Sequence, residues 1–446
     1  MIKTHLAAAV LSLSLSALAP SLAQAADTGG NCHVGAYRLS DGRLVDIGPL
    51  SPDKLRWRLF DGTSGALSAA GDDAWTSTLG WTERPDGKTV RFGTCAAGTI
   101  DFDHVAGTKI PLEAQDTTFI GAGGVKLAGR LVMPPGAARA PIVVLVHGSE
   151  HYSGRDFYPL QRILPAEGVG VFVYDKRGTG HSQGQYTQDF SVLADDAVAA
   201  LSEAKRLAGS RTGRVGYEGG SQGGWVAPLA ASRSHADFVI VGFGLAVTAL
   251  EEDREEVMLD MRLKGHGPGE ITKALELQAA TAELVESHFT EGFAQLDAVR
   301  AKYKDEPWYK DVGGDFTADL LPLTEAQIKT DAKTLEVGTP WRYDPMPVLR
   351  DLKSPQLWIL GADDVDAPSA ETARRIRGLT AAGRPITLAM YPDAEHGIYE
   401  YVTDAKGQRL STRNADGFFR MIRDFALDGR LSGRYGRSAI TGPAAP

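Results

Sequence analysis

The sequence predicts a small all-β N-terminal domain, followed by a mostly parallel, doubly wound α/β sheet that carries a helical insertion. Short β-prone runs fill residues 31–113, with Asp-Gly turns at 41, 61 and 86. From Asp116 onward, apolar runs alternate with helix-prone stretches, which is typical of a parallel sheet covered by helices on both faces. Between the apolar runs that end near Phe243 and begin near Gln356, a long charged, helix-prone stretch interrupts this alternation.

These patterns divide the chain of 446 residues into more than one ordinary domain. We expect a signal peptide at 1–26, a β-rich domain at 27–115 and the α/β unit at 116–446. The stretch 248–345 is interpreted as a helical cap over the C-terminal edge of the sheet, because unstructured loops of that length are uncommon in compact domains. A separate helical domain without a catalytic role is the alternative.

The expected elements of the α/β unit follow directly from the apolar runs and their spacing. Strands are predicted at 126–133, 142–147, 169–175, 213–218, 238–243, 356–361 and 386–391. Helices are predicted at 158–166, 192–208, 222–232, 370–379 and 414–427. The tail after Arg437 is expected to be unstructured.

The N-terminus has the pattern of a cleaved secretory signal. Lys3 precedes an apolar stretch from Leu6 to Leu18, and small residues at 23–26 precede a polar segment. The apolar stretch is shorter than the roughly 20 residues that span a bilayer, which disfavours a membrane anchor. We therefore expect a periplasmic or secreted protein without stable membrane insertion.

The charge balance excludes one class of partner. The formal net charge is −9 and no basic run occurs, whereas nucleic-acid binders need clustered cations to displace counterions from phosphates. The 43% apolar content predicts a packed core. Composition says nothing about oligomeric state.

Two features of the predicted β domain are open to more than one interpretation. Cys32 and Cys95 are expected to pair in an oxidising compartment, and two buried free thiols are the alternative. Neither has the His and Asp partners of a catalytic cysteine. Trp57, Trp75 and Trp81 either form an aromatic binding face or belong to the domain core, which is the commoner case.

The strongest chemical signal is the segment 216–224, which contains Gly219-x-Ser221-x-Gly223 between an apolar strand and a helical stretch. A sharp strand-to-helix turn presents the serine hydroxyl at a helix N-terminus, where the dipole and free N–H groups favour a developing oxyanion. Ser221 is the predicted nucleophile. A glycine-rich structural turn is the alternative.

A serine needs an adjacent base that an acid holds in the right tautomer. His396, directly after the last predicted strand, is the only histidine C-terminal to the insertion and is the predicted base. Asp364 is the predicted acid, because its spacing from Gly361 and Pro368 fits the acid loop better than that of Asp363 or Asp366.

The oxyanion hole requires two donors aimed where negative charge develops. We expect the backbone N–H of Gln222 to be one, and that of Ser149, after the early strand, to be the other. His147 resembles a base but, at a strand end before glycine, is expected to brace this loop.

Together these motifs resemble the α/β-hydrolase superfamily, near its serine aminopeptidase and dienelactone-hydrolase-like esterase branches. The resemblance covers roughly residues 116 to 430. The motifs that carry it are His147-Gly148-Ser149, the segment 175–182 (Asp-Lys-Arg-Gly-Thr-Gly-His-Ser), Gly219-x-Ser221-x-Gly223, Gly361-x-x-Asp364 and His396-Gly397. It implies ester, thioester or amide hydrolysis through an acyl-enzyme, without a metal or organic cofactor. The segment Ser149-Glu150-His151 departs from the commoner Gly-rich oxyanion loop.

The leading hypothesis is therefore a serine esterase acting on small-molecule esters through Ser221, Asp364 and His396. A serine peptidase for short peptides is the first alternative. A polymer-directed esterase that binds its substrate through the β domain is the second, and a binding protein that has lost its chemistry is a third.

Overall fold

The structure, a computed structural model, describes residues 31–71, 73–136 and 138–443. The predicted signal peptide lies outside the described residues. Within the described ranges, no helix combines the length and the apolar character that crossing a membrane requires.

The N-terminal strands close into a barrel in the order β1 to β8, with antiparallel neighbours throughout. Tyr37, Trp57 and Phe102 are almost wholly buried in its core. The barrel strands are β1 (Gly35–Leu39), β2 (Leu44–Ser51), β3 (Lys54–Leu59), β4 (Ser64–Gly71), β5 (Ala74–Leu79), β6 (Pro85–Phe92), β7 (Thr99–Phe102) and β8 (Val105–Lys109).

Cys32 and Cys95 form a disulfide that ties the start of the barrel to the β6–β7 connection. This confirms the predicted pairing, and the alternative of two free thiols is wrong.

The three tryptophans do not form one exposed face. Trp57 is 0% exposed and donates to Ser77 inside the barrel. Trp75 packs edge-on against Phe92, and Trp81 packs against Tyr399 outside the barrel. The hypothesis of a joint aromatic binding face is therefore wrong.

The second unit is built on a nine-stranded sheet in the order β19-β16-β15-β14-β13-β11-β12-β10-β9. The strands from β11 to β16 run parallel, while β9, β10 and β19 are antiparallel to their neighbours. The bounds are β9 (Glu113–Ile120), β10 (Lys126–Met133), β11 (Ala140–Val146), β12 (Gly170–Tyr174), β13 (Thr212–Gly220), β14 (Val239–Gly242), β15 (Gln356–Gly361), β16 (Ile386–Tyr391) and β19 (Ala439–Thr441).

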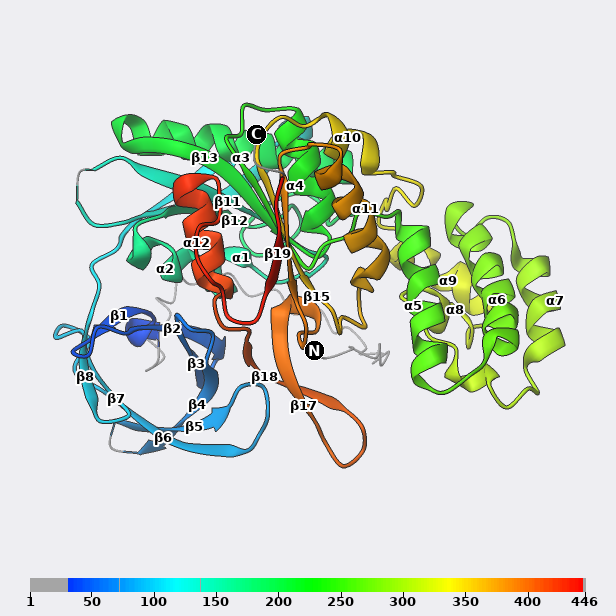
Figure 1. Cartoon of the computed structure of the whole chain (residues 1–446), viewed down its shortest axis with the longest axis horizontal. Helices are drawn as coiled ribbons and strands as arrows, with labels where there is room; N and C mark the ends of the chain where they lie inside the picture. Colours follow the sequence, from blue (N-terminus) through cyan, green and yellow to red (C-terminus); the bar gives the residue numbers. More distant parts are fainter. Residues whose placement is uncertain (1–30, 72, 137, 444–446) are drawn as a thin grey trace, which may run out of the picture.

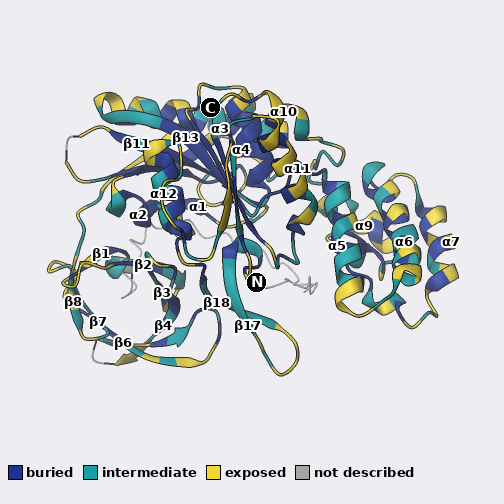
Figure 2. Cartoon of the chain, in the orientation of Figure 1, coloured by how far each residue is buried: buried dark blue, intermediate teal, exposed yellow. Residues whose placement is uncertain are grey.

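Helices cover both faces of this sheet, as Figure 1 shows. One face packs against α3 (Phe190–Ala208), α4 (Gly223–Ser232), α10 (Met346–Asp351) and α11 (Ser369–Ala381). The opposite face packs against α2 (Leu160–Ile163) and α12 (Phe418–Asp428). The central strands are buried on both faces, as in Figure 2, which explains why they read as continuous apolar runs.

The insertion after β14 is a bundle of helices with its own hydrophobic core, beside α11 in Figure 1. Its helices are α5 (Ala249–Leu263), α6 (Pro268–Glu286), α7 (Phe293–Tyr303), α8 (Thr317–Leu320) and α9 (Glu325–Leu335). A capping box formed by Thr248 and Glu251 starts α5. Buried Asp253 accepts hydrogen bonds from the backbone of Phe316 and Thr317, which joins α5 to α8.

Three local predictions are corrected by the structure. In place of the helix predicted at 158–166, the chain forms α2 and a 3₁₀ turn (Pro165–Glu167), with the separate α1 (Gly154–Phe157) before them. Pro159 disfavours helical backbone at Tyr158, and Pro165 opens the new turn. The helix predicted from residue 414 begins at Phe418, after Gly417 in the left-handed region. The tail after Arg437 is not unstructured, since β19 pairs with β16.

The sequence between β16 and α12 forms a hairpin that was not predicted. Its strands β17 (Tyr399–Thr403) and β18 (Arg409–Asn414) pair antiparallel, apart from the main sheet. In Figure 1 the hairpin extends beside the barrel.

Candidate active site

The predicted site residues all follow C-terminal ends of the parallel strands. Ser149 follows β11, Ser221 follows β13, Asp364 follows β15 and His396 follows β16. Because these strands run in one direction, their carboxyl ends share one edge of the sheet, where α/β proteins place their ligands.

Ser221 lies at the turn between β13 and α4 with a φ of +53°. A non-glycine residue there is strained, and such strain is concentrated at functional turns. The turn is also tight: a Cβ on Gly219 would come within 2.3 Å of the carbonyl oxygen of Gly223. The two glycines around Ser221 are therefore required by close backbone approach.

Asp364 and His396 meet although 32 positions separate them in the chain. The Nδ1 of His396 lies 2.9 Å from one carboxylate oxygen of Asp364. The other oxygen accepts the backbone N–H groups of Asp366 and Ala367 at 3.1 and 2.8 Å. Asp363 instead accepts the Tyr401 hydroxyl, so Asp364 is the one of the three aspartates that hydrogen-bonds the ring.

Two opposing effects act on His396. Burial lowers the pKa of the imidazole, but the charge and the hydrogen bond of Asp364, with Asp366 and Glu395 nearby, outweigh burial and raise the pKa of His396 above its ordinary value of 6.5. When Nδ1–H of a neutral imidazole donates to a carboxylate, Nε2 carries the lone pair and can accept a proton.

Phe243 connects this pair to the serine turn. Its ring lies edge-on to the His396 ring, with centroids 4.9 Å apart. A Cβ on Gly220, the residue before Ser221, would come within 2.5 Å of the same phenyl ring. Both the Ser221 turn and the His396 ring therefore pack against one side chain.

Of the two expected oxyanion donors, Gln222 directly follows Ser221 and Ser149 comes from a separate loop. Gln222 is buried at the start of α4, and Ser149 is in the exposed loop after β11. Within the described chain, neither backbone N–H makes a hydrogen bond to another residue. The loop is next to the nucleophile, since a Cβ on Gly148 would lie 3.6 Å from the Ser221 Cβ. Both N–H groups thus keep their hydrogen-bonding capacity in the segments that meet at the Ser221 turn.

His147 braces the loop, as its position suggested. It is 2% exposed, and its Nε2 lies 2.6 Å from the carbonyl oxygen of Tyr174 at the end of β12. Its Nδ1 lies 3.2 Å from a carboxylate oxygen of Glu150, which also accepts the Tyr158 hydroxyl.

Two ionisable residues near the serine were missed by the sequence reasoning. Glu218, three residues before Ser221, is 7% exposed, and burial together with the charge of Glu150 raises its pKa to about 8. Lys176 is 2% exposed, and burial lowers its pKa to about 8 although Glu150 acts in the opposite direction. The only signal in the sequence was their placement inside the segments 175–182 and 216–224, which were already recognised.

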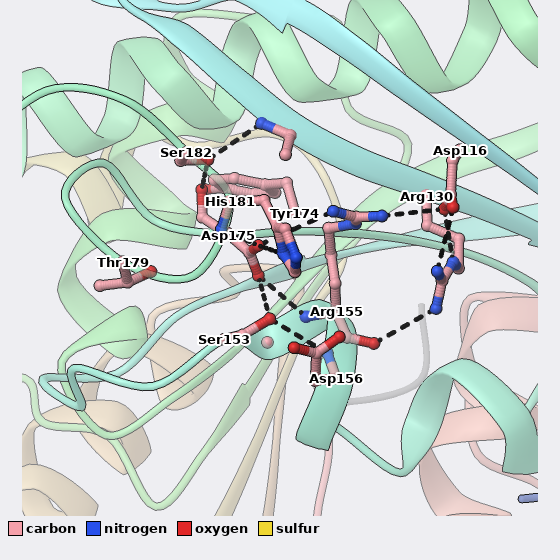
Figure 3. A network of polar contacts seen from close by, with 12 residues as sticks. Asp116, Arg130, Ser153, Arg155, Asp156, Tyr174, Asp175, Thr179, His181 and Ser182 are labelled. Carbon is pink, nitrogen blue, oxygen red and sulfur yellow. Dashed lines mark hydrogen bonds and ion pairs between the residues drawn. The ribbon is translucent and has the colours of Figure 1, made fainter. Parts of the chain in front are cut away.

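Buried Asp175, the first residue of the segment 175–182, is at the centre of a network of polar contacts at the end of β12 (Figure 3). Asp175 is 0% exposed and accepts the Ser153 hydroxyl at 2.7 Å and the backbone N–H groups of Arg155 and His181. The hydroxyl of Ser182 donates to the Asp175 carbonyl at 2.6 Å. These contacts of Asp175 therefore fix the backbone directly before Lys176.

The barrel supports the loop that carries His396. Trp81 packs on Tyr399 with ring centroids 4.4 Å apart, and its N–H donates to the carbonyl of Ser411 in β18. Gly62 of the barrel lies directly against Asn414 at the end of β18: a Cβ on Gly62 would come within 2.2 Å of the Asn414 carbonyl oxygen. Asn414 also donates through its side chain to the carbonyl of Gly397.

A sequence model of the serine aminopeptidase S33 family matches residues 137–400, more than half of the chain. The chain belongs to this α/β-hydrolase family. The family assignment confirms the resemblance inferred from the motifs. The match begins just before β11 and ends in β17, so it includes every predicted site residue of this hydrolase and excludes the barrel.

Individual relatives of the hydrolase are distant. The esterase FrsA of Enterobacter sp. (strain 638) is 28% identical over 118 residues, which are 26% of this chain and 28% of that esterase. The chain thus matches less than a third of that relative's length.

Two solved structures are similar at low identity. An esterase of Pyrococcus furiosus is 16% identical, with 65% of this chain and 84% of that chain covered and a TM-score of 0.41. The acylaminoacyl peptidase of Pyrococcus horikoshii is 15% identical, with 87% and 57% covered and a TM-score of 0.43.

Proposed function

We propose that this hydrolase cleaves small carboxylic esters through an acyl-enzyme formed on Ser221. The observation that carries the proposal is the Asp364–His396 hydrogen bond of 2.9 Å, on the same sheet edge as the strained Ser221 turn and packed with it against Phe243. A strained serine, an imidazole and a buried carboxylate are the groups that acyl transfer by a serine requires.

In the proposed reaction, the Ser221 hydroxyl oxygen attacks the ester carbonyl carbon while its proton moves to Nε2 of His396. Asp364 keeps Nδ1 protonated and stabilises the imidazolium that forms. The backbone N–H groups of Gln222 and Ser149 donate to the oxyanion of the tetrahedral intermediate.

Collapse of this intermediate breaks the bond to the alcohol, which leaves with the proton from His396. Water then attacks the acyl-enzyme with His396 again as base, and the acid is released from Ser221. Every proton moves between Ser221, His396, water and the leaving group.

A peptidase acting on short peptides is the second candidate, and one observation favours it. Burial, together with the charges of Asp315, Glu256, Asp253 and Asp364, raises the pKa of Glu252 in α5 well above its ordinary value. The amino terminus of a peptide would relieve this repulsion beside the proposed acid.

The helical insertion is proposed to act as a cap over the site. Arg375 of α11 pairs with Glu251 of α5 at 2.7 Å. This ion pair supports a bundle anchored beside α11, the helix that follows the acid loop, where it would restrict the size of the substrate.

The proposed location is the periplasm or the exterior of the cell. The disulfide between Cys32 and Cys95 supports an oxidising compartment.

A comparison of leaving groups tests the proposal. The hydrolase is assayed with p-nitrophenyl esters from acetyl to palmitoyl and, in parallel, with amino-acid and dipeptide p-nitroanilides. An esterase turns over a subset of the esters and leaves the anilides intact. Anilide turnover without ester turnover would favour the peptidase over the esterase. If a fluorophosphonate probe failed to label any serine of the folded wild-type protein, both proposals would be contradicted.

A further inference from the structure

Lys176 is a buried cation whose partners all belong to the oxyanion region. It follows the end of β12, and its side chain is 2% exposed. Burying an ammonium group costs free energy unless it is paired and hydrogen-bonded. Among the described residues, however, no carboxylate oxygen lies within 4.0 Å of its Nζ. A structural ion pair therefore does not explain why this lysine is buried.

The hydrogen bonds of Lys176 join two separate loops. Its Nζ donates to the carbonyl oxygen of Gly148 at 2.7 Å and to the side-chain oxygen of Gln222 at 3.3 Å. Gly148 precedes Ser149, and Gln222 follows Ser221. One ammonium group thus holds both segments from which the two proposed oxyanion donors come.

Peptide geometry turns the first of these bonds into a constraint on a donor. The C=O and N–H of a trans peptide point in opposite directions. When Lys176 fixes the Gly148 carbonyl, it also fixes the direction of the Ser149 N–H on the other side of that peptide plane. The second bond holds the side-chain amide of Gln222, the residue whose backbone N–H is the other proposed donor.

Tyr186 completes this arrangement. Its ring lies 4.4 Å from the Lys176 Nζ, and its hydroxyl donates to the carbonyl of Ser149 at 2.6 Å. The loop is therefore held at two successive carbonyls, by Lys176 at Gly148 and by Tyr186 at Ser149. A cation above an aromatic face is attracted to it, so Tyr186 also stabilises the ammonium form.

We propose that Lys176 is a positioning residue of the oxyanion hole. Its ammonium group holds the Gly148–Ser149 peptide and Gln222 in the geometry that stabilises the tetrahedral intermediate. This inference rests on the proposed function of Ser221. Oxyanion donors act because they are preorganised, and loss of one such donor costs about 10² to 10³ in kcat.

The charged state of Lys176 makes the proposal sensitive to pH. The groups that face its ammonium are Glu150, His151 and Tyr186, and the Gln222 amide is neutral. The pKa of Lys176 is lowered to about 8, so kcat is expected to fall as pH rises through that value and the ammonium loses its proton. Glu218, whose pKa is also about 8, requires a control.

The test measures ester kcat and KM for wild type, Lys176→Met, Lys176→Arg and Ser221→Ala, with exposed Lys126→Met as a matched control. Lys176→Met is expected to lower kcat by about 10²-fold with little change in KM, and Lys126→Met to leave both unchanged. Lys176→Arg is expected to keep part of the activity and to lose the fall above pH 8, because a guanidinium stays protonated. Glu218→Gln is expected to leave that fall in place.

The outcomes separate the two proposals. Turnover that depends on Ser221 but is unchanged in Lys176→Met would overturn the role of Lys176 alone. Turnover that survives Ser221→Ala would overturn both proposals. If Lys176→Met does not fold, the pH profiles decide: an alkaline fall near pH 8 that Lys176→Arg shares with wild type would overturn the role of Lys176.

Discussion

Trp81 of the barrel packs on Tyr399, which lies three residues after His396 in the chain, with ring centroids 4.4 Å apart. The same tryptophan donates its backbone N–H to Ser411, in the strand paired with that of Tyr399. The barrel is thus in direct contact with the hairpin that follows the proposed base. This contact gives the N-terminal unit a physical means of acting on catalysis, although it lies outside the family match.

Trp81→Ala is expected to lower kcat about tenfold, because a small displacement of a catalytic group is costly in rate. Trp75→Ala is the matched control, since Trp75 packs edge-on against Phe92 within the barrel and not on the hairpin. Steady-state kinetics and thermal unfolding of both variants check this expectation. Equal losses of kcat in the two variants would indicate that barrel stability alone is responsible.

Asp364→Asn is expected to lower kcat by about 10³ to 10⁴, because an amide fails to hold the imidazole in the required tautomer. It also shifts the pH profile. The base must be neutral, so wild-type kcat/KM rises with pH through a His396 pKa that lies above the ordinary value. Without the Asp364 charge that pKa falls, and the acid limb moves to lower pH. Asp363→Asn, which removes the charge of the carboxylate that accepts the Tyr401 hydroxyl and not of the one that holds His396, should leave the limb in place.

Opening the Cys32–Cys95 disulfide is expected to destabilise the barrel by about 4 kcal/mol in the chain-entropy treatment of a loop of this length. The bond closes a separation of 63 positions around most of the barrel strands. Urea unfolding of wild type and the Cys32→Ser/Cys95→Ser variant, followed by intrinsic tryptophan fluorescence, to which Trp57, Trp75 and Trp81 of the barrel contribute, measures the difference. An unchanged midpoint would show that the barrel does not depend on this bond.

Much of the α/β unit could be predicted because its strands are buried on both faces. Each predicted strand from 126–133 to 386–391 is present to within two residues. The edge strands β9 and β19 were not predicted. β9 is largely exposed and polar, and β19 is exposed and only three residues long, so neither has the apolar pattern on which the prediction relied.

The site was predictable to the extent that chain order determines it. The choice of Asp364 followed from spacing, and the structure joins that residue to His396. The roles of Lys176 and Trp81 could not be predicted, because each depends on carbonyls or rings that come from distant segments. The hairpin β17–β18 had only a weak signal, the alternation around the Asp404–Gly407 turn, and no element was predicted there.

The most direct test of the central claim is p-nitrophenyl ester hydrolysis by wild type and Ser221→Ala, combined with intact-protein mass measurement during turnover. The account predicts ester turnover by wild type, a transient mass increase equal to one acyl group, and loss of both in Ser221→Ala without a change in unfolding temperature. Turnover or acylation that persists in Ser221→Ala would contradict the assignment of the nucleophile and the mechanism built on it.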